Sequence, residues 1–191
     1  MRFLAISGSA RRASTNSALL HALQAAAGDE NSVSVFDRIG DLPVFSPDLE
    51  TPAPPAPVAA FAEAVGQADG LIFACPEYVR SIPGGLKNAI DWLVSREELV
   101  GKPIALIHAS HRGEDMLRQL RIVLATVSDR FTEAPFLRFD LMALSPGEIH
   151  ARLSGHKCQS DMRTYLKEFA DYCRAADARP RIELGPEGQL S

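Results

Sequence analysis

The chain has 191 residues, 46% of them hydrophobic, and its 20 basic and 24 acidic side chains give a formal net charge of −4. This length suits one α/β domain with a full core, and the acidic balance argues against a nucleic-acid binder, which usually carries a basic face. No apolar run approaches the roughly 18 residues of a membrane span, and no signal-peptide pattern precedes the first strand, so we expect a cytoplasmic protein without a membrane partner.

The beginning of the chain predicts a strand, a loop and a helix. Residues 3–6 are apolar throughout, which indicates a buried strand. The spacing of Leu19, Leu20 and Leu23 indicates one buried face of a helix. The loop between them, residues 7–16, should therefore lie at the carboxyl end of a strand and at the positive end of a helix.

The composition of this first loop predicts a phosphate site. Small hydroxylated residues accompany one glycine and two arginines, Arg11 and Arg12. Backbone N–H groups, hydroxyls and a guanidinium at a helix N-terminus together stabilise an anion. An alternative remains open, in which Ser14 or Asn16 only caps the helix and the arginines are solvated. Neither a G-x-G-x-x-G nor a G-x-x-x-x-G-K-[ST] motif is present, so a monophosphate is the expected anion.

The rest of the chain alternates between predicted strands and predicted helices. Residues 41–57 contain six prolines and predict a surface loop. Pro146 and Gly147 are expected to break the chain, and Cys75 is expected to be a buried free thiol within a strand. Further strands are predicted at residues 33–36, 70–75, 104–109 and 134–140. Further helices are predicted at residues 58–67 and 86–93, between the 110–113 loop and about residue 127, and from about residue 161 to 176.

This alternation predicts a flavodoxin-like α/β fold, a three-layer sandwich around a five-stranded parallel sheet of order 2-1-3-4-5. Residues 1–176 should form this single domain, with 177–191 as a C-terminal tail expected to be mobile. In such a sheet a ligand lies at the carboxyl ends of the strands, beside the point where the strand order reverses. Three loops should meet there, residues 7–16, 76–85 and 110–116.

The second and third loops offer contacts to a flat ligand. Tyr78 provides an aromatic surface, although an ordinary loop with a half-buried Tyr78 is the simpler interpretation. Pro76 stiffens the second loop. In the third loop, Ser110 is polar, Gly113 permits close approach of the backbone, and His111 is within reach of the same site.

Two motifs resemble the NADPH-dependent FMN reductase family, which includes bacterial quinone, chromate and azo reductases. The first is Gly8-Ser9-x-Arg11-x-x-Ser14-x-Asn16. The second is Pro76-Glu77-Tyr78-x-x-Ser81-x-Pro83-Gly84-x-Leu86-Lys87-Asn88-Ala89-Ile90-Asp91-Trp92. The resemblance extends from residue 1 to about residue 176 and implies a flavodoxin-like, FMN-binding protein.

The resemblance also implies roles for individual residues. The FMN phosphate would be held by Ser9, Arg11, Ser14, Thr15 and Asn16. The isoalloxazine ring would contact Pro76, Glu77, Tyr78 and Val79, with Ser110 and Gly113 near its edge. Apart from the resemblance, the places of Arg80 and His111 in the predicted loops indicate that they contact the second substrate. For Arg80, a solvated loop arginine is the competing interpretation.

The chain departs from the family pattern within the second motif and in the loop after Ser110. The family often has Asn where this chain has Val79, so a side-chain amide contact to the flavin is missing. Glu114 and Asp115 stand near a position where the family usually has a pair of glycines. Two carboxylates there would disfavour an anionic ligand unless they point away or pair with Arg80 or Arg112.

The implied activity is transfer of hydride from NADPH or NADH through FMN to an acceptor such as a free flavin, a quinone, an azo compound or a metal oxyanion. FMN would carry the chemistry, so no catalytic side chain and no metal site are expected. The alternative is a non-enzymatic flavin carrier or an electron-transfer protein. Family members commonly assemble as dimers or dimers of dimers, and an apolar stripe widened by Trp92 favours a homodimer or homotetramer, unless that stripe is buried within one subunit.

Overall fold

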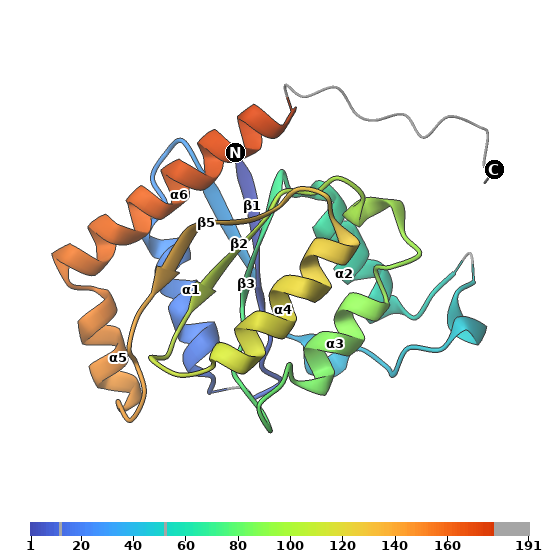
Figure 1. The fold of residues 1–191 in the computed structure, drawn as a ribbon, viewed down its shortest axis with the longest axis horizontal. Coiled ribbons are helices and arrows are strands. Elements are labelled where there is room, and N and C mark those ends of the chain that lie inside the picture. Colours follow the sequence, from blue (N-terminus) through green and yellow to red (C-terminus); the bar gives the residue numbers. More distant parts are fainter. Residues whose placement is uncertain (12, 52, 178–191) are drawn as a thin grey trace.

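The computed structural model describes residues 1–11, 13–51 and 53–177. Its centre is a parallel sheet whose strands lie in the order β2-β1-β3-β4-β5, as Figure 1 shows. The strands are β1 (Arg2–Ser7), β2 (Ser32–Phe36), β3 (Gly70–Ala74), β4 (Ile104–His108) and β5 (Phe131–Arg138). The predicted fold class and strand order are confirmed.

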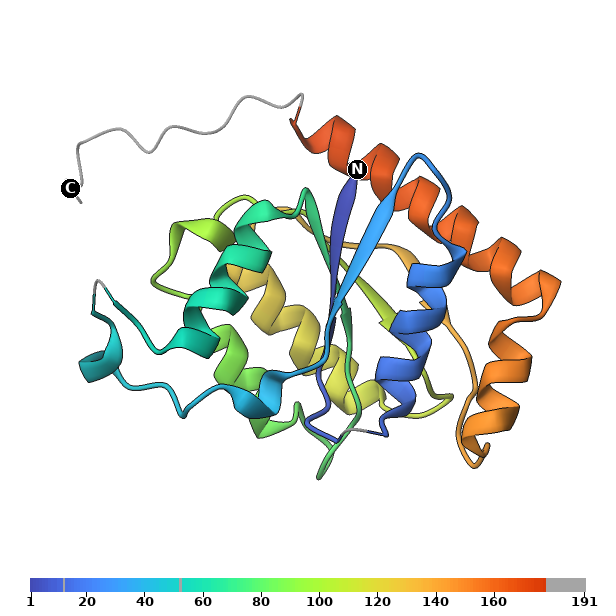
Figure 2. The same cartoon turned by 180° about the vertical axis from the view of Figure 1, so that it is seen from behind.

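Within the described residues, six α-helices cover the two faces of the sheet. They are α1 (Thr15–Ala26), α2 (Ala56–Gln67), α3 (Gly84–Asp91), α4 (Glu114–Val127), α5 (Pro146–Leu153) and α6 (His156–Asp177). Helices α2, α3 and α4 lie on one face, and α1, α5 and α6 lie on the other (Figures 1 and 2).

Alternation along the central strands divides the core between these two faces. Leu4 and Ile6 of β1 pack towards α2 and α3, whereas Phe3 and Ala5 pack towards α1 and α6. Successive side chains of a strand point to opposite sides, so a strand covered by helices on both sides must be apolar throughout. This is why the sequence pattern of these strands predicted their position correctly.

Two expectations about the C-terminal half were wrong. Pro146 does not break the chain but begins α5, because a proline at the first helical position loses no intrahelical hydrogen bond. Ser145 and Glu148 form a capping box at this helix start. The last helix begins at His156 rather than near residue 161 and runs to Asp177, and residues 178–191 of the expected tail lie outside the described residues.

Trp92 does not form a partner surface. Its side chain is 1% exposed, its Nε1 donates a hydrogen bond of 2.8 Å to the Pro43 carbonyl, and its ring meets Phe45 edge-on at 5.2 Å. The proline-rich segment therefore folds over α3 and covers the apolar stripe within one chain. The sequence-based argument for self-association from Trp92 is lost, because the stripe is buried in its own subunit.

Candidate functional site

A cleft of about 470 Å³ lies at the carboxyl ends of the central strands. Its volume falls in the range of about 300–1,000 Å³ that is usual for small-molecule sites. Segments following four different strands form its walls. The lining residues are Arg11, Thr15, Asn16, Cys75, Pro76, Glu77, His108, Ala109, Ser110, Arg112, Gly113, Leu141, Met142, Ala143 and Leu144.

The first wall is the N-terminus of α1. Ser14 is its N-cap, and the Ser14 hydroxyl accepts hydrogen bonds from the backbone N–H groups of Asn16 (3.2 Å) and Ser17 (3.4 Å). The capping role that the sequence left open for Ser14 is therefore real. The first turn of α1 carries no acidic residue, so the positive end of the helix is not neutralised from within its own first turn.

Asn16 presents an unsatisfied group in this wall. The residue is 6% exposed, and its Oδ1 has no hydrogen-bond partner among the described residues. A buried polar atom without a partner costs about 1–3 kcal/mol. Asn16 also belongs to the lining of the cleft.

The second wall, formed by residues 75–77 after β3, continues into a tight hairpin turn. Tyr78 and Ser81 exchange two backbone hydrogen bonds, of 3.1 and 2.9 Å. Between them Val79 and Arg80 have φ angles of +51° and +57°. This left-handed conformation is unfavourable for a β-branched residue and indicates local strain of the kind that clusters at functional sites. The turn projects beyond the carboxyl edge of the sheet (Figure 1, green) and leaves Val79 99% exposed.

Contacts from α4 hold this turn in place. Gln119 donates to the Arg80 carbonyl at 2.9 Å and accepts from the Ser81 hydroxyl at 2.6 Å. The Glu77 carboxylate accepts the Met116 N–H at 3.1 Å. These contacts from α4 hold the turn in one conformation, which explains how two residues with positive φ persist in a stable structure.

The acidic pair at the start of α4 is neutralised by arginines. Asp115 accepts hydrogen bonds from Arg80 (2.6 Å) and Arg118 (3.1 Å), and Glu114 accepts one from Arg138 (2.7 Å). The hydrogen bond from Arg80 lowers the pKa of Asp115, and that from Arg138 lowers the pKa of Glu114. Of the two arginines expected to pair with these carboxylates, Arg80 does bond to Asp115. The arginine that bonds to Glu114 is Arg138 rather than Arg112.

The third wall, formed by residues 108–113 at the end of β4 and after it, is held by the buried side chain of His108. His108 Nε2 donates a hydrogen bond of 2.6 Å to the Arg112 carbonyl, so Nδ1 is the unprotonated nitrogen. Burial lowers the pKa of His108 and keeps the ring neutral. Gly113 has a φ of +102°, and a Cβ there would lie 3.0 Å from His108 Nε2. Glycine is therefore required at this position by both its backbone angle and the closeness of the imidazole.

The fourth wall was not expected from the sequence. It is the segment from Leu141 to Leu144, which follows β5. Met142 Sδ accepts the Ser110 hydroxyl at 2.8 Å, and Asp140 lies 3.0 Å from His111 Nδ1. The rule that places ligands at the carboxyl ends of parallel strands could have pointed to this segment, because β5 neighbours β4.

Residues 1–134 match the family model described as NADPH-dependent FMN reductase. The chain belongs to this family. The resemblance seen in the two sequence motifs is thus confirmed over 134 of 191 residues.

Individual relatives agree with this family. A quinone reductase of Escherichia coli (strain K12) is 39% identical over 116 residues, which span 59% of this chain and 61% of that protein. A 2-hydroxy-1,4-benzoquinone reductase of Burkholderia sp is 30% identical over 181 residues, 90% of this chain and 93% of that protein. Among solved structures, FerB, a flavoenzyme NAD(P)H:(acceptor) oxidoreductase from Paracoccus denitrificans, has a TM-score of 0.75 at 26% identity and covers 92% of this chain and 98% of that one.

Most of the residues predicted for the site of this FMN reductase family member do meet in the cleft. Those in its lining are Arg11, Thr15, Asn16, Pro76, Glu77, Ser110 and Gly113. The others surround it: Ser9 is buried and accepts the Arg11 N–H at 3.2 Å, and Ser14 caps α1. Tyr78, Val79 and Arg80 form the projecting turn, and His111 pairs with Asp140. Cys75 is buried just after β3, and burial raises the pKa of its thiol.

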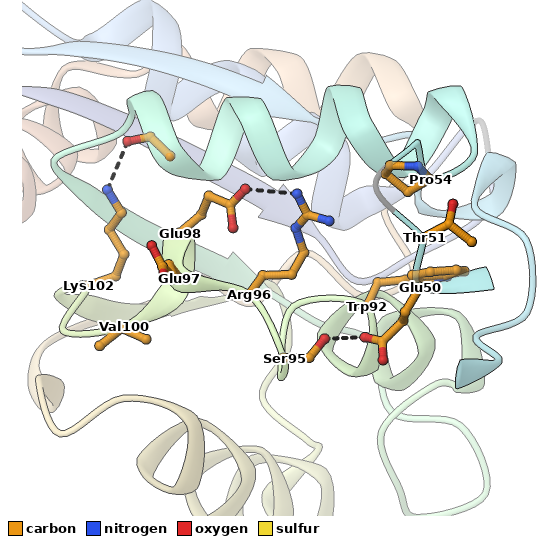
Figure 3. Close-up of a pocket in the computed structure, with 11 residues that line it drawn as sticks. Glu50, Thr51, Pro54, Trp92, Ser95, Arg96, Glu97, Glu98, Val100 and Lys102 are labelled. Atoms are coloured by element: carbon orange, nitrogen blue, oxygen red, sulfur yellow. Dashed lines mark hydrogen bonds and ion pairs between the residues drawn. The ribbon is translucent and has the colours of Figure 1, made fainter. Parts of the chain in front are cut away.

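A larger hollow of about 1,110 Å³ lies away from this cleft (Figure 3). It is at the amino edge of the sheet, where Lys102 precedes β4 and Gly66 lies in the last turn of α2. Lys102 donates to the Gly66 carbonyl at 3.0 Å, and Arg96 pairs with Glu98 at 2.9 Å. Because Lys102 and Arg96 already bond to neighbouring groups, these side chains are less available to bind a ligand in the hollow. Separately, none of the helices that the structure describes is long and apolar enough to cross a membrane.

Proposed function

We propose that this chain is an FMN-dependent NAD(P)H oxidoreductase whose acceptor is a quinone. Membership of the NADPH-dependent FMN reductase family supports the cofactor and the electron donor. The names of the E. coli and Burkholderia relatives support a quinone as the acceptor. The overall reaction would be NAD(P)H + H⁺ + quinone giving NAD(P)⁺ + hydroquinone.

The structural observation that supports a bound flavin most directly is that Asn16 Oδ1 has no hydrogen-bond partner among the described residues. Asn16 lines the cleft beside the positive end of α1, and its Oδ1 is buried. The ribityl chain of FMN carries hydroxyl groups that would satisfy it. The FMN phosphate would then lie at the α1 N-terminus, near Arg11 and Thr15. The first wall of the cleft therefore fits the chemistry of FMN.

The other matched walls would receive the isoalloxazine ring. Pro76 and Glu77 would lie along it, with Ser110 and Gly113 at its edge. When bound, FMN would supply the redox chemistry by taking a hydride from the nicotinamide and passing two electrons to the acceptor. The protein's own contribution is to bind and orient. Asn16 would hold the ribityl chain of FMN, and His108 holds the third wall. The contacts of Gln119 fix the turn beside the second wall.

The neutralised carboxylates bear on the electrostatics of this site. Glu114 and Asp115 each pair with an arginine, so the start of α4 carries less net negative charge than its sequence indicates. A reduced flavin or a nucleotide phosphate would be repelled less than expected. Arg80 is 83% exposed yet bonded to Asp115, and its proposed contact with the nucleotide would use the guanidinium nitrogens that this bond leaves exposed.

The alternative of a flavodoxin-like shuttle has less support. A shuttle would sandwich the ring between aromatic side chains, and Trp92 is buried against Phe45 away from the cleft. A homodimer or homotetramer and a cytoplasmic location stay predictions. Light scattering on a size-exclusion column tests the first.

Titration with FMN tests the proposed function. We expect the protein to bind one FMN with quenching of the flavin fluorescence and to oxidise NADPH or NADH in the presence of a quinone. Asn16→Ala should weaken FMN binding about tenfold, the loss expected for one buried hydrogen bond. Asn31→Ala, on the turn before β2, is the matched control and should leave binding unchanged. A wild-type protein that neither binds FMN nor oxidises NAD(P)H would overturn the proposal.

A further inference from the structure

The fourth wall of the cleft lies outside the part of the chain that defines the family. The family match ends at residue 134, and among the described residues that line the cleft only Leu141 to Leu144 lie beyond it. Relatives are named for different acceptors, including a quinone, a hydroxybenzoquinone and, for a subunit from Vibrio ruber, (hydroxy)cinnamate. The match to the family model therefore does not account for this wall, and its role has to be inferred from its own contacts.

We propose that Met142 contacts the electron acceptor and that the segment 139–145 determines which acceptor is used. The acceptor class that it fits is a flat, uncharged, polarisable ring such as a quinone. This inference rests on the proposed function and extends it to a residue that neither the sequence motifs nor the comparisons indicate.

The backbone of the segment presents Met142 to the cleft and holds it there. Leu141 is buried and packs in the core with Ile149 of α5, so the start of the segment is anchored. Met142 itself is 41% exposed in the cleft lining. Ala143 has a φ of +61°, a strained angle for a residue with a Cβ. Backbone strain of this kind is common at binding sites, so the strained Ala143 next to Met142 supports a binding role for Met142.

Two side-chain contacts fix the segment relative to the third wall. The Ser110 hydroxyl bonds to Met142 Sδ, and His111 bonds to Asp140. Ser110 Oγ also accepts the Arg112 N–H at 2.9 Å. Met142 is therefore held in register with the loop that carries Gly113. The segment is a fixed wall of the cleft rather than a free loop.

The chemistry of the wall selects among possible acceptors. Leu141, Met142, Ala143 and Leu144 carry no charge, so this side of the cleft favours an apolar surface over a metal oxyanion. A thioether makes favourable contacts with aromatic rings, and methionine adapts to differently shaped partners. Both properties suit a quinone that must enter and leave at each turnover.

Steady-state kinetics of the FMN-loaded protein test this proposal. Wild type and Met142→Ala are compared with two acceptors under saturating NADPH, 2-methyl-1,4-naphthoquinone and ferricyanide. Ferricyanide is a charged ion that takes one electron at a time, so that NADPH + 2 ferricyanide gives NADP⁺ + H⁺ + 2 ferrocyanide. We expect kcat/KM for the naphthoquinone to fall about tenfold, mainly through KM, as for loss of one apolar contact. The value for ferricyanide and the Kd of FMN should stay within about twofold.

Two further variants complete the experiment. Met142→Leu keeps the apolar volume and should retain most of the naphthoquinone activity, whereas Ile122→Ala removes an exposed apolar side chain from α4 and should change nothing. Unchanged naphthoquinone kinetics in Met142→Ala would overturn the inference, as would an equal loss with both acceptors. A weakened FMN Kd would overturn it by placing Met142 in the cofactor site. Wild-type protein that binds no FMN would instead overturn the proposed function, and this inference with it.

Discussion

The Arg80 guanidinium donates a 2.6 Å hydrogen bond from Nε to the Asp115 carboxylate, joining the projecting turn after β3 to the first turn of α4. The two residues are 35 positions apart in the chain. The pair has two consequences, since it helps to hold a strained turn and it neutralises a carboxylate next to the cleft. Both consequences can be tested separately.

Replacing Asp115 by Asn should change the use of the nucleotide more than the stability. The variant frees the guanidiniums of Arg80 and Arg118 and removes one negative charge, so kcat/KM for NADPH should rise at low salt. Raising the ionic strength should shrink the gain, because exposed charges are screened. Measurements of kcat/KM at about 20 and 300 mM salt check this. A gain that is independent of salt would show that steering by charge is not the cause.

Replacing Val79 by Asn should stabilise the fold. Asn tolerates a positive φ better than a β-branched residue, so the variant should relieve strain of about 1 kcal/mol. Urea denaturation monitored by circular dichroism measures the change. Val44→Asn, which alters another strongly exposed valine, in the proline-rich segment, is the control and should give no gain. If both variants behave alike, the strain at Val79 is not significant.

The buried imidazole of His108 should make the stability depend on pH. Burial lowers its pKa in the folded state below the value of about 6.5 in the unfolded chain. Between these two pKa values the unfolded state binds more protons, so stability should be lost as the pH falls below about 6.5. His108→Gln keeps a donor for the Arg112 carbonyl but does not titrate. Its free energy of unfolding should decline less than that of wild type between pH 7.5 and 5.5.

An exposed histidine provides the comparison for this experiment. His150→Gln on α5 should keep the wild-type decline, because its side chain faces solvent. A decline that is the same in His108→Gln and in wild type would assign the pH dependence to other groups.

Replacing Trp92 by Phe should weaken the fold without altering the assembly. The variant loses the hydrogen bond to the Pro43 carbonyl and part of a filled core position, which together cost about 2 kcal/mol. Chemical denaturation measures this loss. Light scattering should give wild type and variant the same mass, since Trp92 is covered by its own chain. A change in mass with unchanged stability would contradict the burial seen here.

Most secondary structure was predictable because local pattern and tertiary position agree. The apolar run at 70–75 had to be a central strand, and its neighbours on both sides now cover it. Pro146 shows where local reasoning failed. A proline both ends and begins helices, but Ser145 and Glu148 stand at the spacing of a capping box, and this signal in the sequence indicated that Pro146 begins a helix.

The sequence by itself determined the sheet order, the family and three of the four walls of the cleft, because strand pattern and short motifs carry that information locally. The tertiary structure decided which partners the charged and apolar residues find. Ser110 with Met142 and Trp92 with Pro43 join residues more than 30 positions apart. The structure also replaced Arg112, one of the two arginines expected to pair with the carboxylates, by Arg138, which bonds to Glu114. Contacts of this kind depend on how the strands bring distant loops to one edge, and no local pattern encodes them.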